Sequence, residues 1–227
     1  MHPSPWQRAL APVYRKFFDL LYHEYAWTYD AVAGLVSLGQ WQAWVESVLP
    51  YLRGPRILEL GHGPGHLQRL LQERHLRVVG LDESPQMGRL AYRRLKGSGK
   101  NPLLVRGYAQ STPFPNNSFD QIVATFPSEY IYQEQTVREI SRLLVPGGEF
   151  LLLPVAWISG KRPAQRLAAW LFQVTGQAPS PETARRILQE QDHPSLTNFQ
   201  KAGFQIEFLP IEHRASVALL IRMSKDR

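Results

Sequence analysis

The spacing of hydrophobic positions changes along the chain and divides it into three parts. In the first part, Pro5 to Leu52, apolar and aromatic residues recur at helical intervals, in Leu35 to Leu49 and at Phe17, Phe18, Leu21, Tyr22 and Tyr25. An apolar side chain every three or four positions is typical of an amphipathic helix. We therefore expect two helices before any strand, forming a helical cap segment over residues 1–52.

In the second part, from Arg56 onward, short apolar runs alternate with longer helical patterns. The runs predict strands at Arg56–Leu60, Arg77–Leu81, Leu103–Gly107, Phe119–Thr125 and Glu149–Pro154. Helices are expected between them, at about Gly65–Glu73, Ser84–Leu95 and Tyr130–Leu144, with Pro146-Gly147-Gly148 as a helix stop and turn. This alternation indicates βαβ units and a parallel sheet.

The third part begins with an aromatic and basic stretch, Val155 to Gly176, which we expect to be an inserted helix and not a strand. It would form a helical lid at about 155–180. A helix from Pro181 to about Glu190 and a shorter one at Ser195–Ala202 follow. Strands at Phe204–Pro210 and Ala215–Met223 close the chain, and the short polar link between them predicts an antiparallel hairpin.

Together these elements predict the α/β class. We expect a Rossmann-like, doubly wound and mostly parallel seven-stranded sheet over residues 53–227, with N-terminal helices and a C-terminal antiparallel hairpin. A length of 227 residues with 44% apolar and 20% charged residues is consistent with one domain and its attached segments.

Composition narrows the classes of site. The chain has no cysteine, which excludes disulfides, thiolate metal sites and a cysteine nucleophile and fits a reducing, cytoplasmic setting. The apolar stretch Phe150–Ile158 is shorter than the roughly 18 residues that a membrane-spanning helix needs. Met1 to Leu10 lacks the apolar core of a signal peptide. We expect a cytoplasmic protein.

The net charge of +7 is compatible with nucleic acid, an anionic membrane surface or an acidic substrate as a partner. The basic residues are spread along the chain with no long tract, so a solvated basic surface is the simpler interpretation.

The sharpest motif is a glycine-rich turn, Gly61-His62-Gly63-Pro64-Gly65, directly after the strand that contains Glu59. Glycine lets the backbone approach a ligand closely, and the start of the next helix offers free N–H groups. A purely structural turn would have the same composition.

A second motif makes the binding interpretation stronger. The apolar strand Val78-Val79-Gly80-Leu81 ends in Asp82, 21 residues after Gly61. A carboxylate about 20 residues past a glycine turn is placed to accept hydrogen bonds from ribose hydroxyls. The alternative is that Asp82 caps the helix that starts near Ser84.

These motifs resemble the class I S-adenosylmethionine-dependent methyltransferases, in particular the group that includes quinone-ring and small-molecule methylators. The resemblance covers roughly Tyr29 to Leu153. The glycine turn of this chain follows the pattern G-x-G-x-G instead of the G-x-G-x-x-G of nicotinamide dehydrogenases. This difference favours methyl transfer over hydride transfer. The implied cofactor is S-adenosylmethionine, with S-adenosylhomocysteine as product.

The resemblance implies a role for each matching position. Glu59 and the backbone of Gly61, His62, Gly63 and Gly65 would hold the amino-acid end of the cofactor, and Asp82 its ribose. Glu83 would lie beside the ribose and adenine, and Met87 would be an apolar adenine contact, although a core position explains Met87 equally well. Tyr29 of the Tyr29-Asp30 pair would fold over the cofactor.

The chain departs from the family after the third strand. Tyr108 stands where relatives commonly carry Asp, so the polar contact to adenine differs, and the backbone N–H of Ala109 is expected to supply the specific hydrogen bond. At the end of the fourth strand, Thr125 and Phe126 would lie along the methionine portion of the cofactor.

Several assignments stay open. Glu129, Tyr130 and His23 are candidates for a catalytic base, which methyl transfer needs only when the acceptor must lose a proton. Ser128 with Glu129 is equally a good helix start, and Trp41 and Trp44 are expected to be core contacts. His62, His66 and His75 lack the partner ligands of a metal site, so none is expected.

Three functions are compared. The favoured one is methylation of a small-molecule or lipid-like acceptor under the helical lid, with weak peripheral membrane contact as an extension of it. The alternative is a cofactor-binding regulatory or scaffold protein without catalysis, for which Tyr108 is the one indication. Nucleic-acid methylation is disfavoured because Thr125-Phe126-Pro127-Ser128 lacks the Asn/Asp-Pro-Pro-aromatic type of motif that base methylation requires.

Overall fold

The computed structural model describes residues 37, 39–97, 102–158 and 194–225. Tyr29, His23, most of the expected helical cap, residues 159–180 of the expected lid and the helix expected after Pro181 lie outside these ranges.

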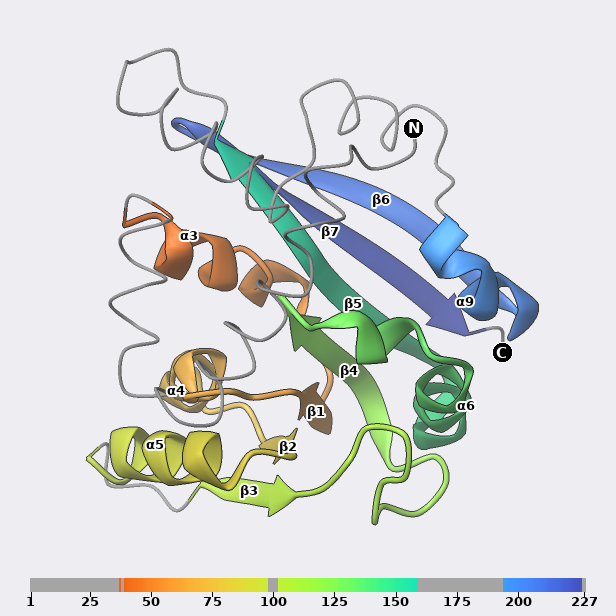
Figure 1. The fold of residues 1–227 in the computed structure, drawn as a ribbon, viewed down its shortest axis with the longest axis horizontal. Coiled ribbons are helices and arrows are strands. Elements are labelled where there is room, and N and C mark those ends of the chain that lie inside the picture. The colour runs from red at the N-terminus through yellow and green to blue at the C-terminus, as the bar shows by residue number, and fades with distance from the viewer. Residues whose placement is uncertain (1–36, 38, 98–101, 159–193, 226–227) are drawn as a thin grey trace, which may run out of the picture.

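A seven-stranded sheet organises the molecule, in the order β3-β2-β1-β4-β5-β7-β6 (Figure 1). The five strands that come first in the chain are mutually parallel, and β7 runs antiparallel to both β5 and β6. Their bounds are β1 (Ile57–Leu60), β2 (Val78–Asp82), β3 (Leu103–Arg106), β4 (Phe119–Thr125), β5 (Leu144–Ile158), β6 (Phe204–His213) and β7 (Ser216–Lys225). The predicted Rossmann-like α/β fold with its C-terminal hairpin is confirmed.

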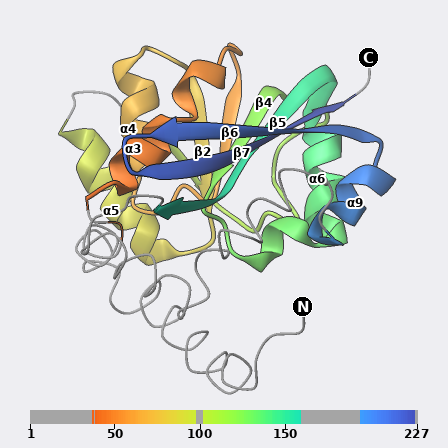
Figure 2. The same ribbon diagram turned by 90° about the horizontal axis from the view of Figure 1, so that it is seen from above.

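Helices cover both faces of the sheet, giving three layers (Figure 2). One face carries α3 (Trp41–Glu46), α4 (His66–Glu73) and α5 (Pro85–Lys96), and the other carries α6 (Glu134–Leu143) and α9 (Thr197–Lys201). Short 3-10 turns precede or join these helices: η2 (Leu49–Tyr51), η3 (Glu129–Tyr132) and η4 (Pro194–Leu196).

The central strands are mostly apolar because both of their faces are covered. Phe150 and Leu152 of β5 belong to the core cluster on the α6 side, whereas Leu151 and Leu153 belong to the cluster on the α3 side. All four side chains are fully buried. A parallel strand between two helical layers has no polar face, which explains the uninterrupted apolar runs in the sequence.

Two predicted helix boundaries are wrong. The helix expected at Tyr130–Leu144 begins as the 3-10 turn η3, and its α-helical part starts at Glu134. The helix expected over Leu35–Leu49 is α-helical from Trp41 to Glu46, after Gly39 with a φ of 77°. Pro50 then lies inside η2. Proline cannot continue hydrogen bonding through a helix interior, which explains this ending.

The expected helix at Val155 is also wrong at its start, because β5 continues to Ile158. Val155, Ala156, Trp157 and Ile158 pair with β7, and this pairing buries Ala156 and Ile158. The ladder and the burial outweigh the helical spacing of the sequence. The Pro146-Gly147-Gly148 stop falls at a register shift of β5, between the pairs Phe119–Leu144 and Gln121–Glu149.

Across the described ranges, no helix has both the length and the hydrophobicity that a membrane span requires.

Candidate active site

The glycine turn after β1 depends on backbone conformations that favour glycine. Gly61, Gly63 and Gly65 have φ angles of 71°, 51° and 83°. A Cβ on Gly65 would lie 2.9 Å from the Cβ of Ala91, so this glycine lets α4 approach α5. A Cβ on Gly63 would meet no atom within 4 Å. Gly63 therefore faces open space, while Gly65 is needed for packing.

Asp82, at the tip of β2, is joined to this turn. Its Oδ2 accepts the Gly63 N–H at 2.8 Å and its Oδ1 accepts the Ser84 N–H at 2.8 Å. A carboxylate has about four acceptor positions, so each oxygen keeps capacity for a further donor. The helix cap is Ser84, whose Oγ accepts the Met87 N–H at 3.2 Å. The alternative interpretation of Asp82 as the cap of α5 is wrong.

Buried polar groups lie beneath the turn. Glu59 is 1% exposed and its Oε2 accepts a hydrogen bond from Gln68 Nε2 at 2.8 Å. Burial raises the pKa of Glu59 to about 8, the Gln68 hydrogen bond opposes this rise, and the charge of Asp82 adds to it. Glu59 therefore carries a proton at neutral pH when no cation is near it.

His62 is the other ionisable group under the turn. It is 4% exposed, and its Nδ1 donates to the Gly63 carbonyl at 2.7 Å. Burial lowers the pKa of His62, and the charge of Asp82 opposes this shift. The imidazole is thus neutral at physiological pH and acts as a hydrogen-bond donor to the turn.

Two residues that the sequence analysis missed support the turn. Gln68 of α4 is fully buried against Glu59. Arg94 of α5 donates through Nη1 to the Pro64 carbonyl at 2.5 Å. Arg94 is 30 residues from Pro64 in the chain, so no local motif relates the two.

The tips of β2 and β3 are also joined. The Gly107 N–H donates to the Asp82 carbonyl at 3.1 Å, and Arg106 Nε donates to the Glu83 carbonyl at 3.2 Å. The next residues form a tight turn in which the Ser111 N–H donates to the Tyr108 carbonyl at 3.2 Å. Tyr108 is 61% exposed there. Ala109 and Met87 are buried, and the side chain of Glu83 is exposed.

At the end of β4, Phe126 follows Thr125 with a φ of 49°, an unusual backbone for a large side chain. Its N–H donates to the Leu153 carbonyl at 2.7 Å. Its ring centroid lies 4.3 Å from that of Trp41 and 6.2 Å from that of Trp44. Trp44 is a core residue as expected, since it is 1% exposed. Trp41 is partly buried on Phe126, so α3 meets the sheet at the carboxyl end of β4.

The candidate bases near η3 differ in position. Glu129 is exposed. The Tyr130 hydroxyl is buried, and it would collide with a Cβ on Gly61. Ser128 occupies the N-cap position of η3 with Glu129 in its first turn, as the helix-start interpretation expected, but the Ser128 hydroxyl makes no cap hydrogen bond. Among the described candidates, Tyr130 is the one that reaches the glycine turn.

Within the part of the chain that the structure describes, no group of three or more His, Asp or Glu side chains is arranged to hold a metal ion.

Comparisons with known proteins find methyltransferases among the proteins similar to this chain. A family model described as a methyltransferase domain matches residues 58–152, which span the strands of the site. An uncharacterized methyltransferase, YdaC, of Bacillus subtilis (strain 168) is 29% identical over 82% of this chain and 94% of its own length.

Two relatives have a named acceptor. A demethylmenaquinone methyltransferase of Thermotoga maritima is 27% identical over 84% of this chain and 89% of its own length. Another, of Symbiobacterium thermophilum, is 32% identical over 66% of this chain, which spans 61% of that relative.

The solved structures show the same fold. A putative S-adenosylmethionine-dependent methyltransferase from Methanococcus maripaludis aligns with a TM-score of 0.62 at 19% identity, over 89% of this chain and 92% of the other. The matched domain contains the glycine turn and Asp82, and the relatives extend the match over most of the chain. The chain carries a methyltransferase domain and has the fold of the class I S-adenosylmethionine-dependent methyltransferases, and these findings support an enzyme with S-adenosylmethionine as its cofactor.

Proposed function

We propose that this methyltransferase acts on a small, apolar or lipid-like acceptor that binds against Phe126 and Trp41 at the carboxyl end of β4. The observation that carries the proposal is the Phe126–Trp41 pair, with ring centroids 4.3 Å apart at the sheet edge where ligands of open α/β sheets bind. Such rings favour a planar apolar group. A quinol ring is the first candidate because demethylmenaquinone methyltransferases are among the relatives.

The donor is proposed to lie across the tips of β1 and β2. The open space at Gly63 leaves room for a ligand to lie close to the Gly63 backbone. The remaining acceptor capacity of Asp82, one position on each oxygen, matches the two hydroxyls of a ribose diol. These observations fit S-adenosylmethionine, whose sulfonium supplies a methyl group for in-line displacement by an acceptor lone pair.

The amino-acid end of the donor is proposed to lie over the Gly61–Gly65 backbone. Glu59 is too deeply buried to touch a ligand directly, at 1% exposure. Its role is electrostatic, because a cation above the turn favours the ionised carboxylate. His62 holds the turn through its bond to the Gly63 carbonyl.

The remaining positions are assigned by their place around this path. Asp82 and Glu83 are proposed at the ribose, and Met87, Tyr108 and Ala109 at the adenine. Thr125 and Phe126 are proposed between the methionine portion and the acceptor, with Tyr29 of the 1–52 cap segment folded over the cofactor.

For an acceptor that loses a proton, Tyr130 is the proposed proton-handling group. Its hydroxyl is buried against the glycine turn, whereas Glu129 is exposed. Burial raises the pKa of the neighbouring Tyr132 to about 12.

The acceptor class is tested with tritiated S-adenosylmethionine and a panel containing a short-chain prenylated naphthoquinol, histamine and phosphoethanolamine. We expect label transfer to the naphthoquinol. We also expect Trp41→Ala to reduce kcat/KM for it while Trp41→Phe retains most of it, with S-adenosylhomocysteine affinity unchanged in both. We call Phe126 and Trp41 the acceptor wall. Label transfer to the polar compounds instead, at a rate that Trp41→Ala does not change, would contradict this wall.

The proposal extends to weak contact with anionic membranes, where a lipid-like acceptor resides. The net charge of +7 supports it. Sedimentation with anionic and with neutral vesicles at low salt tests it, and equal recovery of the protein with both would contradict it.

A further inference from the structure

The connection from β3 to β4, residues 107–118, crosses the sheet without a helix of its own. The strand order places β2 and β1 between its ends. The connection therefore crosses about 14 Å of sheet, three strand spacings of roughly 4.8 Å. Backbone groups in such a segment need partners from elsewhere.

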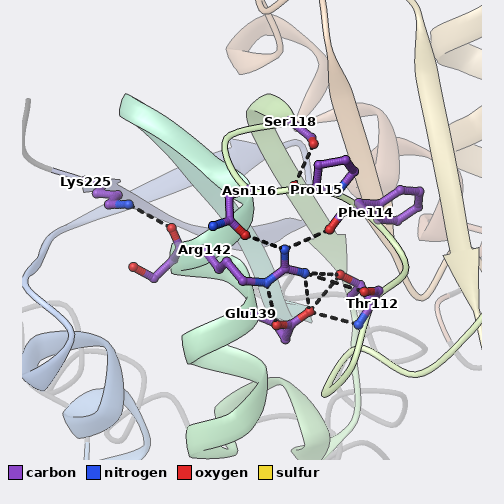
Figure 3. Close-up of polar contacts among 9 residues, drawn as sticks. Thr112, Phe114, Pro115, Asn116, Ser118, Glu139, Arg142 and Lys225 are labelled. Atoms are coloured by element: carbon purple, nitrogen blue, oxygen red, sulfur yellow. Dashed lines mark hydrogen bonds and ion pairs between the residues drawn. The ribbon is translucent and has the colours of Figure 1, made fainter.

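A single ion pair on α6 supplies many of those partners (Figure 3). Glu139 Oε2 accepts both the N–H and the hydroxyl of Thr112 at 2.8 Å. Arg142 Nη1 donates to the Phe114 carbonyl and to Asn116 Oδ1, each at 2.8 Å. Arg142 also holds Glu139 with two nitrogens, both at 2.8 Å. We call Glu139 and Arg142 the α6 clamp.

The clamp acts directly beside the turn formed by residues 108–111. On one side, this turn is fixed by the Gly107 N–H to the Asp82 carbonyl, at 3.1 Å. On the other side it is fixed at Thr112 by Glu139. The turn that carries Tyr108 and Ala109 is thus held between the backbone of Asp82, whose side chain is the proposed ribose ligand, and the α6 clamp.

We propose that Glu139 and Arg142 are positioning residues for the nucleoside half of the donor, which they do not touch. They set the place of the 108–111 turn relative to Asp82. This inference rests on the donor site proposed above. It predicts that loss of the clamp weakens binding of the adenosyl group while leaving the amino-acid end and the acceptor wall in place.

The chain offers a chemically matched control. At the amino end of the sheet, Arg56 holds Asp120 with two nitrogens, at 2.9 and 2.8 Å, and Asp120 also accepts the Arg56 N–H at 3.1 Å. This pair likewise joins a connecting segment to an element of the fold, but Arg56 directly precedes β1, at the end opposite to the proposed site. Removing either pair would cause any general loss of stability, whereas only the α6 clamp lies beside the proposed site.

The test compares Arg142→Met with Arg56→Met by calorimetric titration of S-adenosylhomocysteine and of 5′-methylthioadenosine, which lacks the amino-acid end. In catalysis, misplacing a group by about 1 Å can cost about a hundredfold in rate, and we expect a smaller effect of the same origin on binding. We expect Arg142→Met to raise the Kd of both compounds by the same factor, about tenfold, and Arg56→Met to leave both Kd values within about twofold of wild type. Arg142→Lys keeps the charge but not the two-nitrogen contact, should show a smaller loss of the same kind, and carries the test if Arg142→Met does not fold.

Three outcomes would overturn the role of the clamp: unchanged Kd values in the Arg142 variants, a loss confined to S-adenosylhomocysteine, or an equal loss in Arg56→Met. Wild-type protein that binds neither compound would instead overturn the proposed donor site, so the two failures are distinguishable.

Discussion

The Asp82 carboxylate accepts the Gly63 N–H at 2.8 Å, which joins the tip of β2 to the glycine turn that follows β1. The contact brings two residues of neighbouring strand ends together before any ligand arrives. A preorganised site loses less conformational entropy on binding, so this contact favours donor affinity.

Asp82→Ala should weaken binding of S-adenosylhomocysteine by roughly 1.5 to 3 kcal/mol, the range for hydrogen bonds to a charged group. Calorimetric titration measures this. Glu73→Gln, an exposed substitution on α4, is the control and should bind as wild type does. Unchanged affinity in Asp82→Ala would remove the ribose role from this carboxylate.

Two glycine substitutions should separate binding from folding. Gly63→Ala and Gly65→Ala both incur roughly 1–2 kcal/mol of left-handed backbone strain. A Cβ at Gly63 points into open space, whereas one at Gly65 lies 2.9 Å from Ala91 Cβ and 3.1 Å from its Cα. Overpacking adds about 1–3 kcal/mol at Gly65.

Denaturant unfolding with parallel titration of S-adenosylhomocysteine checks this separation. We expect Gly63→Ala to lose donor affinity with a modest loss of stability, and Gly65→Ala to be the less stable variant. The reverse order of stabilities would contradict the open space at Gly63 and the close packing at Gly65, and unchanged donor affinity in Gly63→Ala would contradict a ligand at Gly63.

Glu59 should make stability and donor binding depend on pH. Its pKa is about 8 in the folded chain against 4.5 in the unfolded reference. Below pH 4.5 Glu59 is protonated in both the folded and the unfolded chain, and its contribution to stability is fully present. Between the two values the unfolded chain binds fewer protons, so the free energy of unfolding falls as pH rises, by up to about 1.4 kcal/mol per pH unit. Glu59→Gln should abolish this slope.

The same carboxyl should release a proton when the cationic donor binds, because a nearby positive charge favours its ionised form. Titrating S-adenosylmethionine near neutral pH in buffers with different ionisation enthalpies measures that proton. We expect release in the wild type and none in Glu59→Gln. Equal heats across buffers for the wild type would show that the donor's charge does not reach Glu59.

Tyr130→Phe should separate proton handling from donor binding. A general acid or base contributes about 10²–10⁴-fold to a rate. With an acceptor that must lose a proton, we expect kcat to fall by about 100-fold or more while the Kd of S-adenosylhomocysteine changes by less than about threefold. Glu129→Gln, at the exposed neighbouring candidate, is the comparison. A larger kcat loss in Glu129→Gln than in Tyr130→Phe would reverse the assignment.

Local patterns were sufficient to predict most of the sheet and its motifs. Phe119–Thr125 matches β4 residue for residue, and the glycine turn lies between β1 and α4 as expected. These features depend on short-range periodicity and on glycine's backbone freedom, both of which are encoded within a few neighbouring residues.

Features that depend on distant partners could not be predicted this way. Val155–Ile158 is a strand because β7, about 60 residues later, pairs with it. The α6 clamp joins Glu139 to Thr112, 27 residues apart, and the pattern of α6 alone marks that glutamate as an ordinary helical surface charge. Side-chain contacts of this range arise from the fold and leave no local motif.

The central claim is that the glycine turn and Asp82 hold the nucleoside sulfonium between neighbouring strand tips. A crystal structure with S-adenosylhomocysteine tests it most directly. We expect the ribose hydroxyls within hydrogen-bonding distance of the Asp82 carboxylate and the amino-acid end above Gly63. Density for the ligand elsewhere on the molecule, with Asp82 making no contact to it, would contradict this donor site.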